Sequence, residues 1–531
     1  MNCNATRLPY QRTGFFSGII EDYLNGSEKL ADFRGPAPDL VGIKEAIFQR
    51  RKFNTKRNIL VEELKKQYSG IRMAAEVRQN IDRLMEPNCF TITTAHQPAL
   101  FTGSLYFIYK IIHTIKLARQ LSESMTDCNF VPIFYMGSED ADLEELSKIY
   151  FDQQEVIWET NQTGAVGRMK TKGLEKIIER IEGEFSVDPF GPELVRLLKE
   201  SYLESENVQT ACFKLIDALF SKWGVVVLIP DNENLKRLML PIFEEDLFSQ
   251  TPFKVLEKPL DQLSQHYKIQ AQPREINLFY LKDGLRGRIE KIAERFIVHD
   301  SKLSFSESEL RSELQNHPER FSPNVILRGI YQETVLPNIL FLGGGGELAY
   351  WLEFKPMFKH YGVPYPILVL RNSFLIVEKK WKEKMDRSGI PIAEIFKPEE
   401  ELVNDLVRRE SRNQLGLEKE IVEANSYYEH LKTLSGSIDP SLSQHVESLH
   451  SKAIRPIMEL EKKLLKAEKR KFEEQHKQIA QIKSGLFPLE NLQERIENFI
   501  PYYARWGRTF LQMIYDHSPG LEQEFTLLEE R

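Results

Sequence analysis

The chain has 531 residues, of which 41% are hydrophobic, and its 71 basic and 78 acidic residues give a net charge of −7. Because this length exceeds what one hydrophobic core usually serves, we expect two to four domains. The near balance of charge excludes recruitment of nucleic acid or of an anionic membrane by a bulk electrostatic field.

Other global features favour a protein of the reduced cytoplasm. The sequence contains no apolar run of about 18 residues, which argues against a membrane span. Its first residues form no apolar signal core, so we expect no secretory leader. The four cysteines form no CxxC pair, and this pattern indicates neither a disulfide framework nor a zinc knuckle.

The first 88 residues predict a helical preface to a sheet. After an irregular start with glycine and proline, apolar residues recur three and four positions apart. We expect these helices to pack on the core and assign no chemistry to them.

Residues 89–124 predict a strand, a polar turn and a helix of about 20 residues that begins near Ser104. Such a unit opens a doubly wound sheet, in which ligands lie beyond the carboxyl ends of the strands and against helix N-termini. His96 and Gln97 fall at that corner. The alternative interpretation is a polar turn that only caps the helix.

Two further predicted strands, residues 129–137 and 225–230, also end in polar side chains. These are Glu139, Asp140 and Asp142 after the first strand, and Asp231 and Asn232 after the second. A polar cluster therefore follows a predicted strand three times. This recurrence favours a Rossmann-like binding site more than any single cluster does.

The middle of the chain predicts an insertion and then a return to the sheet. Residues 273–305 alternate like antiparallel hairpins, and residues 306–319 return to helix behind a Ser-x-Ser-Glu cap. Further on, a strand runs into Gly343–Gly346 and then a helix. Such a turn lets backbone N–H groups approach an anion, but it lacks the spacing of a phosphate loop. The alternative is a tight turn that shapes a pocket.

Arg328 and Arg371 are the fixed cations that we expect near a carboxylate or phosphate, with surface salt bridges as the alternative. From about residue 375 the pattern predicts helices only. Two long apolar stripes joined by a Gly/Pro turn at residues 435–441 indicate an antiparallel coiled-coil hairpin. So narrow a stripe needs a partner, and a homodimer is the simplest one.

The predicted fold class is α/β, with a Rossmann-like parallel sheet, a connective insertion and a C-terminal α-helical antiparallel coiled coil. The expected divisions are a helical preface at 1–88, the core at 89–272 and 321–395, the insertion at 273–320, the hairpin at 396–484 and a segment that packs back on the core at 485–531.

Collinear motifs over nearly the whole chain resemble those of the bacillithiol-biosynthesis cysteine-adding enzymes. They are Thr93–Gln97 with Leu100–Tyr106, Ser138–Asp142, Leu327-Arg328, Leu336-Pro337, Gly343–Glu347, Ala349-Tyr350, Pro366–Arg371 and Leu492–Arg495. The chain departs from the family pattern at three positions: Ala95 replaces a glycine, Ala141 a histidine and Gly345 a proline.

The resemblance implies a coiled coil that dimerises and a core similar to the nucleotidyltransferase fold of class I aminoacyl-tRNA synthetases. It also implies a ligase that joins L-cysteine to glucosaminyl-malate through an amide, in the last step of bacillithiol synthesis. The expected partners are therefore these two small molecules and a second copy of the chain, with no nucleic acid and no membrane.

The resulting site hypothesis assigns three groups of residues. The catalytic candidates are His96, Gln97, Glu139 and Asp140. The substrate-binding candidates are Thr94, Tyr106, Asp142, Asn324, Arg328, Glu347, Tyr350, Arg371 and Asn372. The nucleotide-binding candidates are Gly103, Ser104, Gly343, Gly344, Gly345 and Gly346. ATP with Mg²⁺ is the candidate activator, and we assign no metal site to the protein itself.

In this hypothesis His96 and Gln97 stabilise charge on a phosphate, the acids bind or deprotonate an amine, and the arginines hold carboxylates. Two alternatives keep the same sequence features: a nucleotidyltransferase-like ligase with another amine acceptor, and a coiled-coil scaffold whose core only binds a nucleotide. The three polar clusters favour an enzyme, because a scaffold has no need to gather them.

Overall fold

A computed structural model describes residues 3–151 and 153–531, which divide into two compact units. The first unit comprises residues 1–375 and 491–528, and the second comprises residues 376–490 and 529–531. The first unit is therefore discontinuous, since the chain leaves it for the second unit and then returns.

The first unit is built on a five-stranded sheet with the order β13-β12-β2-β3-β6. Its strands are β2 (Cys89–His96), β3 (Asn129–Met136), β6 (Val226–Leu228), β12 (Asn338–Gly343) and β13 (Ile367–Leu370). All four pairings are parallel, so the carboxyl ends of the strands share one edge. This arrangement confirms the predicted Rossmann-like core.

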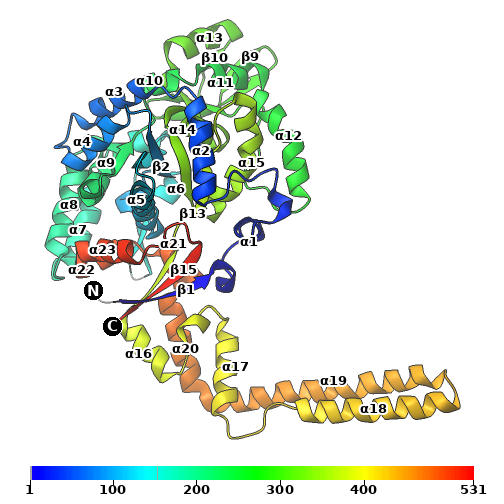
Figure 1. The fold of residues 1–531 in the computed structure, drawn as a ribbon. Helices are drawn as coiled ribbons and strands as arrows, with labels where there is room; N and C mark the ends of the chain where they lie inside the picture. Colours follow the sequence, from blue (N-terminus) through cyan, green and yellow to red (C-terminus); the bar gives the residue numbers. More distant parts are fainter. Residues whose placement is uncertain (1–2, 152) are drawn as a thin grey trace. The chain divides into compact units, whose positions relative to one another are not determined.

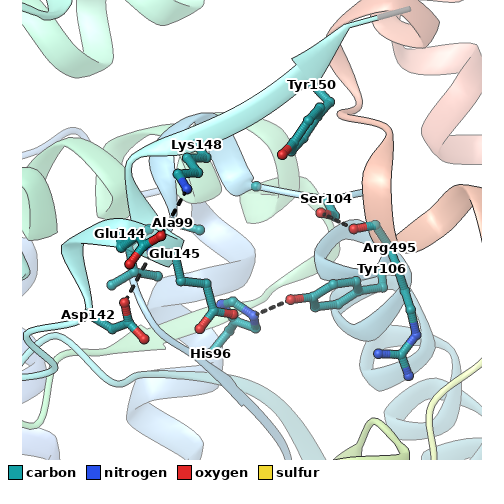
Figure 2. Close-up of a pocket in the computed structure, with 12 residues that line it drawn as sticks. His96, Ala99, Ser104, Tyr106, Asp142, Glu144, Glu145, Lys148, Tyr150 and Arg495 are labelled. Atoms are coloured by element: carbon teal, nitrogen blue, oxygen red, sulfur yellow. Dashed lines mark hydrogen bonds and ion pairs between the residues drawn. The ribbon is translucent and has the colours of Figure 1, made fainter. Parts of the chain in front are cut away.

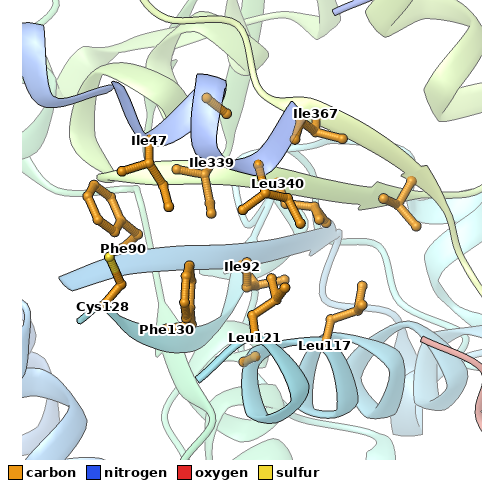
Figure 3. Close-up of a cluster of buried hydrophobic side chains, with 14 of the residues drawn as sticks. Ile47, Phe90, Ile92, Leu117, Leu121, Cys128, Phe130, Ile339, Leu340 and Ile367 are labelled. Carbon is orange, nitrogen blue, oxygen red and sulfur yellow. The ribbon is translucent and has the colours of Figure 1, made fainter. Parts of the chain in front are cut away.

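Apolar helix faces pack on this sheet and form its core (Figure 3). Helix α2 (Leu40–Lys52) contributes Ile43 and Ile47, and α5 (Tyr106–Ser124) contributes Leu117 and Leu121. They meet strand residues such as Ile92, which is fully buried. At about 25 cal/mol per Å² of buried apolar surface, such clusters supply the main driving force of folding.

A buried polar ladder fixes the register of β2 against β12. The hydroxyls of Thr91 and Thr93 donate to Oδ1 of Asn338 at 3.1 and 2.8 Å. The Asn338 amide donates in turn to Glu333, which pairs with Arg50 of α2 at 2.5 Å. Since each of these groups is buried, a slip of one residue would leave several polar atoms unpaired.

The predicted insertion is an antiparallel sheet with the order β10-β9-β8-β7-β11. Its strands are β7 (Leu278–Lys282), β8 (Leu285–Ile292), β9 (Arg295–Val298), β10 (Ser304–Phe305) and β11 (Phe321–Pro323). Helix α13 (Glu307–Asn316) follows β10, and Ser306 with Glu309 forms a capping box at its start. The expected cap is thus confirmed.

The remaining elements of the first unit surround these two sheets (Figure 1). They are α1 (Gly18–Leu24), α3 (Arg57–Tyr68), α4 (Ala75–Arg83), α6 (Leu143–Leu146), β4 (Lys148–Phe151), β5 (Gln154–Ile157), α7 (Leu174–Phe185), α8 (Gly191–Leu198), α9 (Val208–Phe220), α10 (Glu233–Arg237), α11 (Leu240–Glu244), α12 (Thr251–Ser264), α14 (Val325–Val335), α15 (Gly345–Tyr361), α21 (Gln493–Ile496), α22 (Ile500–Trp506) and α23 (Arg508–His517).

The expectation of helices only after residue 375 was wrong. Strands β14 (Phe374–Val377) and β15 (Glu524–Glu530) form a three-stranded sheet with β1 (Cys3–Pro9), in the order β1-β15-β14. The preface therefore also contains a strand. A four-residue apolar run such as β14 has no periodicity that separates strand from helix, and β1 and β15 are about 500 residues apart in sequence.

The second unit contains the predicted antiparallel hairpin. Helices α18 (Glu418–Ile438) and α19 (Leu442–Lys469) lie side by side (Figure 1) and are joined by residues 439–441. An ion pair between Lys432 and Glu447 and a 2.6 Å hydrogen bond between Asn425 and His450 connect them. Helices α16 (Lys379–Arg387), α17 (Glu399–Glu410) and α20 (Glu473–Leu486) complete this unit. Within the described ranges, no helix is both long and apolar enough to cross a membrane.

Candidate functional site

Two cavities lie where polar side chains follow the sheet strands. The first has a volume of about 370 Å³ and is lined by His96, Ala99, Gly103, Ser104, Tyr106, Asp142, Glu144, Glu145, Leu146, Lys148, Tyr150 and Arg495 (Figure 2). The second has a volume of about 230 Å³ and is lined by Tyr135, Gly137, Glu139, Asp140, Pro230, Phe279, Arg286, Pro323, Asn324, Val325 and Arg328. Strand β2 ends at the first cavity, and its neighbour β3 ends at the second.

His96, the last residue of β2, is held as a neutral imidazole in the first cavity. Burial, then the Lys110 ammonium, lowers its pKa to about 4. Its Nδ1 lies 2.9 Å from the carbonyl of Gln97, which can only accept, so Nδ1 carries the proton. Nε2 therefore accepts from the hydroxyl of Tyr106 at 3.0 Å. In this state His96 accepts a hydrogen bond at the cavity rather than donating one.

The loop between β2 and α5 is held in an uncommon conformation by the C-terminal segment. Phe101, Thr102 and Gly103 all have positive φ angles, of 46°, 67° and 63°. Nδ2 of Asn498 donates to the carbonyls of Phe101 at 3.0 Å and Gly103 at 2.5 Å. Non-glycine residues adopt such angles at a cost of about 1–3 kcal/mol each, so these contacts must outweigh that strain.

Acidic residues from the start of α6 form one wall of the first cavity. Asp142 caps this helix, since its Oδ1 accepts from the Glu145 N–H at 3.1 Å. Burial, then the charges of Asp142 and Asp140, raises the pKa of Glu145. Figure 2 shows the Glu145 carboxylate pointing toward His96, with Lys148 and Arg495 as cations at the rim. A carboxylate with a raised pKa beside a cavity is a candidate proton acceptor.

The positive end of α15, at the four-glycine turn, already binds a carboxylate of the chain itself. The Gly344 N–H donates to Oε2 of Glu347 at 2.8 Å, so a carboxylate of the chain takes the positive end of α15. Glu347 also forms an ion pair with Lys110, which is 1% exposed. A phosphate at this helix start would have to displace a bound carboxylate. Gly343–Gly346 line neither of the two cavities.

Gln97 lines neither cavity and binds Asp140, which lines the second one. Its amide donates to Oδ2 of Asp140 at 3.1 Å. Oδ1 and Oδ2 of Asp140 lie 3.6 and 3.9 Å from the guanidiniums of Arg286 and Arg328. Burial would raise the pKa of Asp140, but the charges of the two arginines, together with hydrogen bonds from Gln97 and the Ala141 N–H, lower it overall. Asp140 is therefore an ionised carboxylate between two cations.

Glu139 points to a separate ionic network. Its carboxylate pairs with Lys236, which is fully buried and lies 3.4 Å from Asp231. Asp231 is also held by Nε and Nη2 of Arg168, both at 2.7 Å. This network joins two of the three polar clusters predicted from the sequence, those after β3 and β6. The close Lys236 contact gives Glu139 a structural partner.

Other predicted site residues stabilise the surrounding fold and line neither cavity. The hydroxyl of Thr94 donates to the carbonyl of Leu342 at 2.9 Å, between β2 and β12. Arg371 is buried against Glu494 at 2.8 Å, and the Asn372 amide donates to Ser518. Tyr350 lies on α15, and its hydroxyl contacts Arg328. These residues surround the site rather than face its open volume.

Sequence reasoning missed three residues that line the cavities, Arg286, Glu145 and Arg495, and one buried residue behind them, Lys110. Lys110 interrupts the apolar stripe of α5, a signal that could have marked it. Arg286 lies in the insertion, where alternation predicts strands but not which side chains reach the core. Glu145 continues the acidic run after β3, and Arg495 belongs to the C-terminal motif. Among the described residues, no group of three or more His, Cys, Asp or Glu could hold a metal ion.

The fold and these cavities define a Rossmann-like α/β protein with ionisable residues gathered at the carboxyl edge of its sheet. The model of the bacillithiol biosynthesis BshC N-terminal Rossmann-like domain matches residues 1–372, and that of the BshC C-terminal coiled-coil domain matches residues 374–530. The chain belongs to the BshC family.

Named relatives match over nearly the full length. The putative cysteine ligase BshC of Flavobacterium johnsoniae is 37% identical over 525 residues, which cover 98% of this chain and 99% of the relative. Those of Cytophaga hutchinsonii and Christiangramia forsetii are 37% and 35% identical, over 94% and 98% of both chains. These matches confirm the family resemblance and the prediction of an enzyme of the ligase class.

Among solved structures, a putative arginyl-tRNA synthetase from Campylobacter jejuni covers 85% of this chain at 10% identity. Its TM-score of 0.22 is too low to support an argument about the fold. The likeness to aminoacyl-tRNA synthetases stays a prediction.

Proposed function

We propose that this protein joins the carboxyl group of L-cysteine to the amine of glucosaminyl-malate, as the last step of bacillithiol synthesis in the cytoplasm. The observation that carries the proposal is the family match over both domains, together with a cavity of about 370 Å³ that contains a neutral histidine and a carboxylate of raised pKa. Amide synthesis needs such groups, because the amine must lose a proton before it attacks.

Activation of a free carboxylate needs a leaving group, and ATP with Mg²⁺ is the proposed source of it. The first cavity offers Lys148 and Arg495 for phosphate oxygens, and the carboxylates of Asp142 and Glu144 suit Mg²⁺. The α15 start is a poorer choice, since Glu347 already binds its N–H. The cysteine carboxylate would become an acyl-phosphate with release of ADP, or an acyl-adenylate with release of pyrophosphate, and phosphate or AMP would leave when the amine attacks.

In amide formation, Glu145 acts as the proton acceptor and His96 positions the Tyr106 hydroxyl. Glu145 accepts the proton released by the sugar ammonium, which frees the nitrogen lone pair for attack. His96 orients the Tyr106 hydroxyl by accepting its hydrogen bond, and this holds the phenol at the cavity wall. The earlier role of His96 as a donor to phosphate fits less well, because its lowered pKa leaves Nε2 without a proton near pH 7.

The reaction is tested with purified protein, L-cysteine, glucosaminyl-malate, ATP and Mg²⁺, and the thiol product is measured by mass spectrometry. We expect Glu145→Gln to lower kcat by about 100-fold or more, the usual range for loss of a positioned base. Glu123→Gln serves as the control, because this glutamate is exposed on α5 and pairs with Arg119. Equal turnover by the wild type and the Glu145→Gln variant would remove Glu145 from the mechanism.

The same assay separates the alternative functions. No product with any cysteine and amine pair would favour a nucleotide-binding scaffold, and product with a different amine would favour another acceptor. Metabolite profiling of a deletion strain adds a cellular test: accumulated glucosaminyl-malate supports the ligase, and an unchanged thiol pool opposes it.

Self-association through the hairpin is also proposed. Large apolar side chains of α18 and α19 are exposed, with Leu434, Ile438, Leu449 and Leu460 between 42% and 77% accessible. Exposed apolar residues at coiled-coil spacing gain stability when a second copy covers them.

A further inference from the structure

The second cavity brings together two arginines from distant parts of the sequence. Arg286 comes from β8 of the insertion, and Arg328 comes from the first turns of α14. Both line the same volume of about 230 Å³ with Tyr135 and Asn324. The first cavity, in contrast, is lined by neither arginine.

The two arginines and the carboxylates of Glu139 and Asp140 line this cavity, and their ionic network extends to Arg168, Lys236 and Asp231, which do not line it. Arg286 and Arg328 share the single carboxylate of Asp140, at 3.6 and 3.9 Å, and they approach different oxygens of it. Glu139 is already paired with Lys236, which also contacts Asp231, and Asp231 is held by Arg168. The contacting groups thus comprise four cations (Arg168, Lys236, Arg286 and Arg328) and three carboxylates (Glu139, Asp140 and Asp231), an excess of one positive charge.

Among the residues that the structure describes, two buried polar atoms of this cavity have no hydrogen-bond partner. They are Nε of Arg286 and the hydroxyl of Tyr135, whose side chain is 1% exposed. An unpaired buried donor costs about 1–3 kcal/mol, so a site that keeps two of them beside an open volume is suited to a ligand that accepts hydrogen bonds.

Two further features preorganise this cavity for a negatively charged ligand: the fixed Arg286 guanidinium and the N-terminus of α14. The Arg286 guanidinium lies 3.9 Å from the centre of the Phe279 ring, which fixes its plane. Asn324 caps α14, and Asn324 and Val325 both line the cavity, so the positive end of this 11-residue helix faces it.

We propose that the second cavity binds the two non-reacting carboxylates of a small dicarboxylate, which under the proposed function is the malyl group of the amine substrate. The two guanidiniums lie against different oxygens of Asp140, so each takes one carboxylate, with Arg286 Nε and the Tyr135 hydroxyl donating as well. A single compact phosphate would place its whole charge beside Asp140. The insertion thereby supplies a specificity-determining residue, Arg286, and the Gln97–Asp140 pair separates this subsite from the first cavity.

L-Malate alone is the direct probe, with binding measured by isothermal titration calorimetry in the absence of cysteine and ATP. We expect Arg286→Gln to weaken malate binding by about 100-fold, because a charge-assisted bidentate contact is lost. Tyr135→Phe removes a hydroxyl that has no hydrogen-bond partner among the described residues, so it should not lower thermal stability, and it should weaken malate binding by about tenfold.

Arg288→Gln is the matched control, since Arg288 lies two residues further along β8 and pairs with Glu290 outside the cavity. It should bind malate like the wild type. L-Lactate and inorganic phosphate serve as ligand controls, and both should bind more weakly than malate. Wild-type affinity in both Arg286→Gln and Tyr135→Phe would overturn the proposal, as would tighter binding of phosphate than of malate.

Turnover separates this subsite from the proposed function on which it rests. If the ligase reaction is observed, Arg286→Gln should raise KM for glucosaminyl-malate and leave KM for cysteine unchanged. If no turnover is observed but malate binds with the expected dependence on Arg286 and Tyr135, the proposed reaction fails while the dicarboxylate subsite stands. Equal increases in both KM values would contradict a role confined to the malyl group.

Discussion

Replacement of Lys110 by methionine tests the buried ion pair behind the first cavity. Lys110 is 1% exposed, pairs with Glu347 and donates to the carbonyl of Ala95 at 2.9 Å. Removal of one partner of a buried pair costs about 3–5 kcal/mol, because the other charge stays buried without compensation. Glu347 is 23% exposed and keeps its hydrogen bond from Gly344, so we expect the lower end, about 3 kcal/mol.

The double variant Lys110→Met/Glu347→Gln removes both charges and should lose only about 1–2 kcal/mol relative to the wild type. Urea unfolding of the wild type, Lys110→Met, Glu347→Gln and the double variant, followed by circular dichroism, measures this coupling, with the transition of each unit fitted separately. Lys110→Met should also raise the pKa of His96, since the ammonium lowers it. A single variant within about 0.5 kcal/mol of the wild type, or a double loss equal to the sum of the single losses, would refute this reasoning.

Three further predictions concern backbone, protonation and assembly. Gly507→Ala should lower the free energy of unfolding in urea by about 3 kcal/mol, because Gly507 has a φ of 57° and a Cβ there would lie 2.6 Å from the Phe190 ring. Gly183→Ala, on the open surface of a helix, should raise it by about 0.5–1 kcal/mol. Equal effects of the two substitutions would contradict this prediction. Burial lowers the pKa of His113 to about 4. Between about pH 6.5 and pH 4 the unfolded chain therefore binds a proton that the folded chain does not bind, and the free energy of unfolding should fall by up to about 3 kcal/mol over this range. His113→Gln should flatten this pH dependence in unfolding experiments. Leu449→Glu with Leu460→Glu should shift sedimentation from dimer to monomer without loss of helix content, and an unchanged sedimentation coefficient would oppose the hairpin seam.

The core and the hairpin were predictable because their signals are local. The run Val225–Pro230 and the helical spacing after Ser104 each specify an element without reference to the rest of the chain. The predicted second strand likewise appears as β3, Asn129–Met136. In each case one segment contains both the periodicity and the residues that end it.

The strands at the two ends of the chain were not predictable for the opposite reason. Strand β15 has the sequence Glu-Phe-Thr-Leu-Leu-Glu-Glu, which suits an amphipathic helix as well as a strand. What makes it a strand is its position between β1 and β14, and no local pattern encodes that neighbourhood.

The candidate site was predictable in part for a related physical reason. Polar residues after strands could be collected at one edge, since parallel strands share their carboxyl ends. Sequence could not show that His96 and Asp140 would face different cavities, or that Glu347 would neutralise the glycine turn. Those outcomes depend on side-chain partners such as Lys110 and Arg286, whose positions follow only from the packed structure.

The discontinuous first unit has a consequence for the order in which the enzyme becomes competent during synthesis. Three residues from 491–528 complete the site. Asn498 donates a hydrogen bond to the loop after His96, and Arg495 lines the first cavity. Glu494 pairs with Arg371 and accepts a hydrogen bond from the Phe374 N–H at 3.1 Å. A ribosome therefore finishes the hairpin before the residues that complete the site emerge. The closure spans more than 100 residues, yet its entropic cost grows only with the logarithm of that length. A nascent chain that stops within the hairpin has a sheet but no finished site.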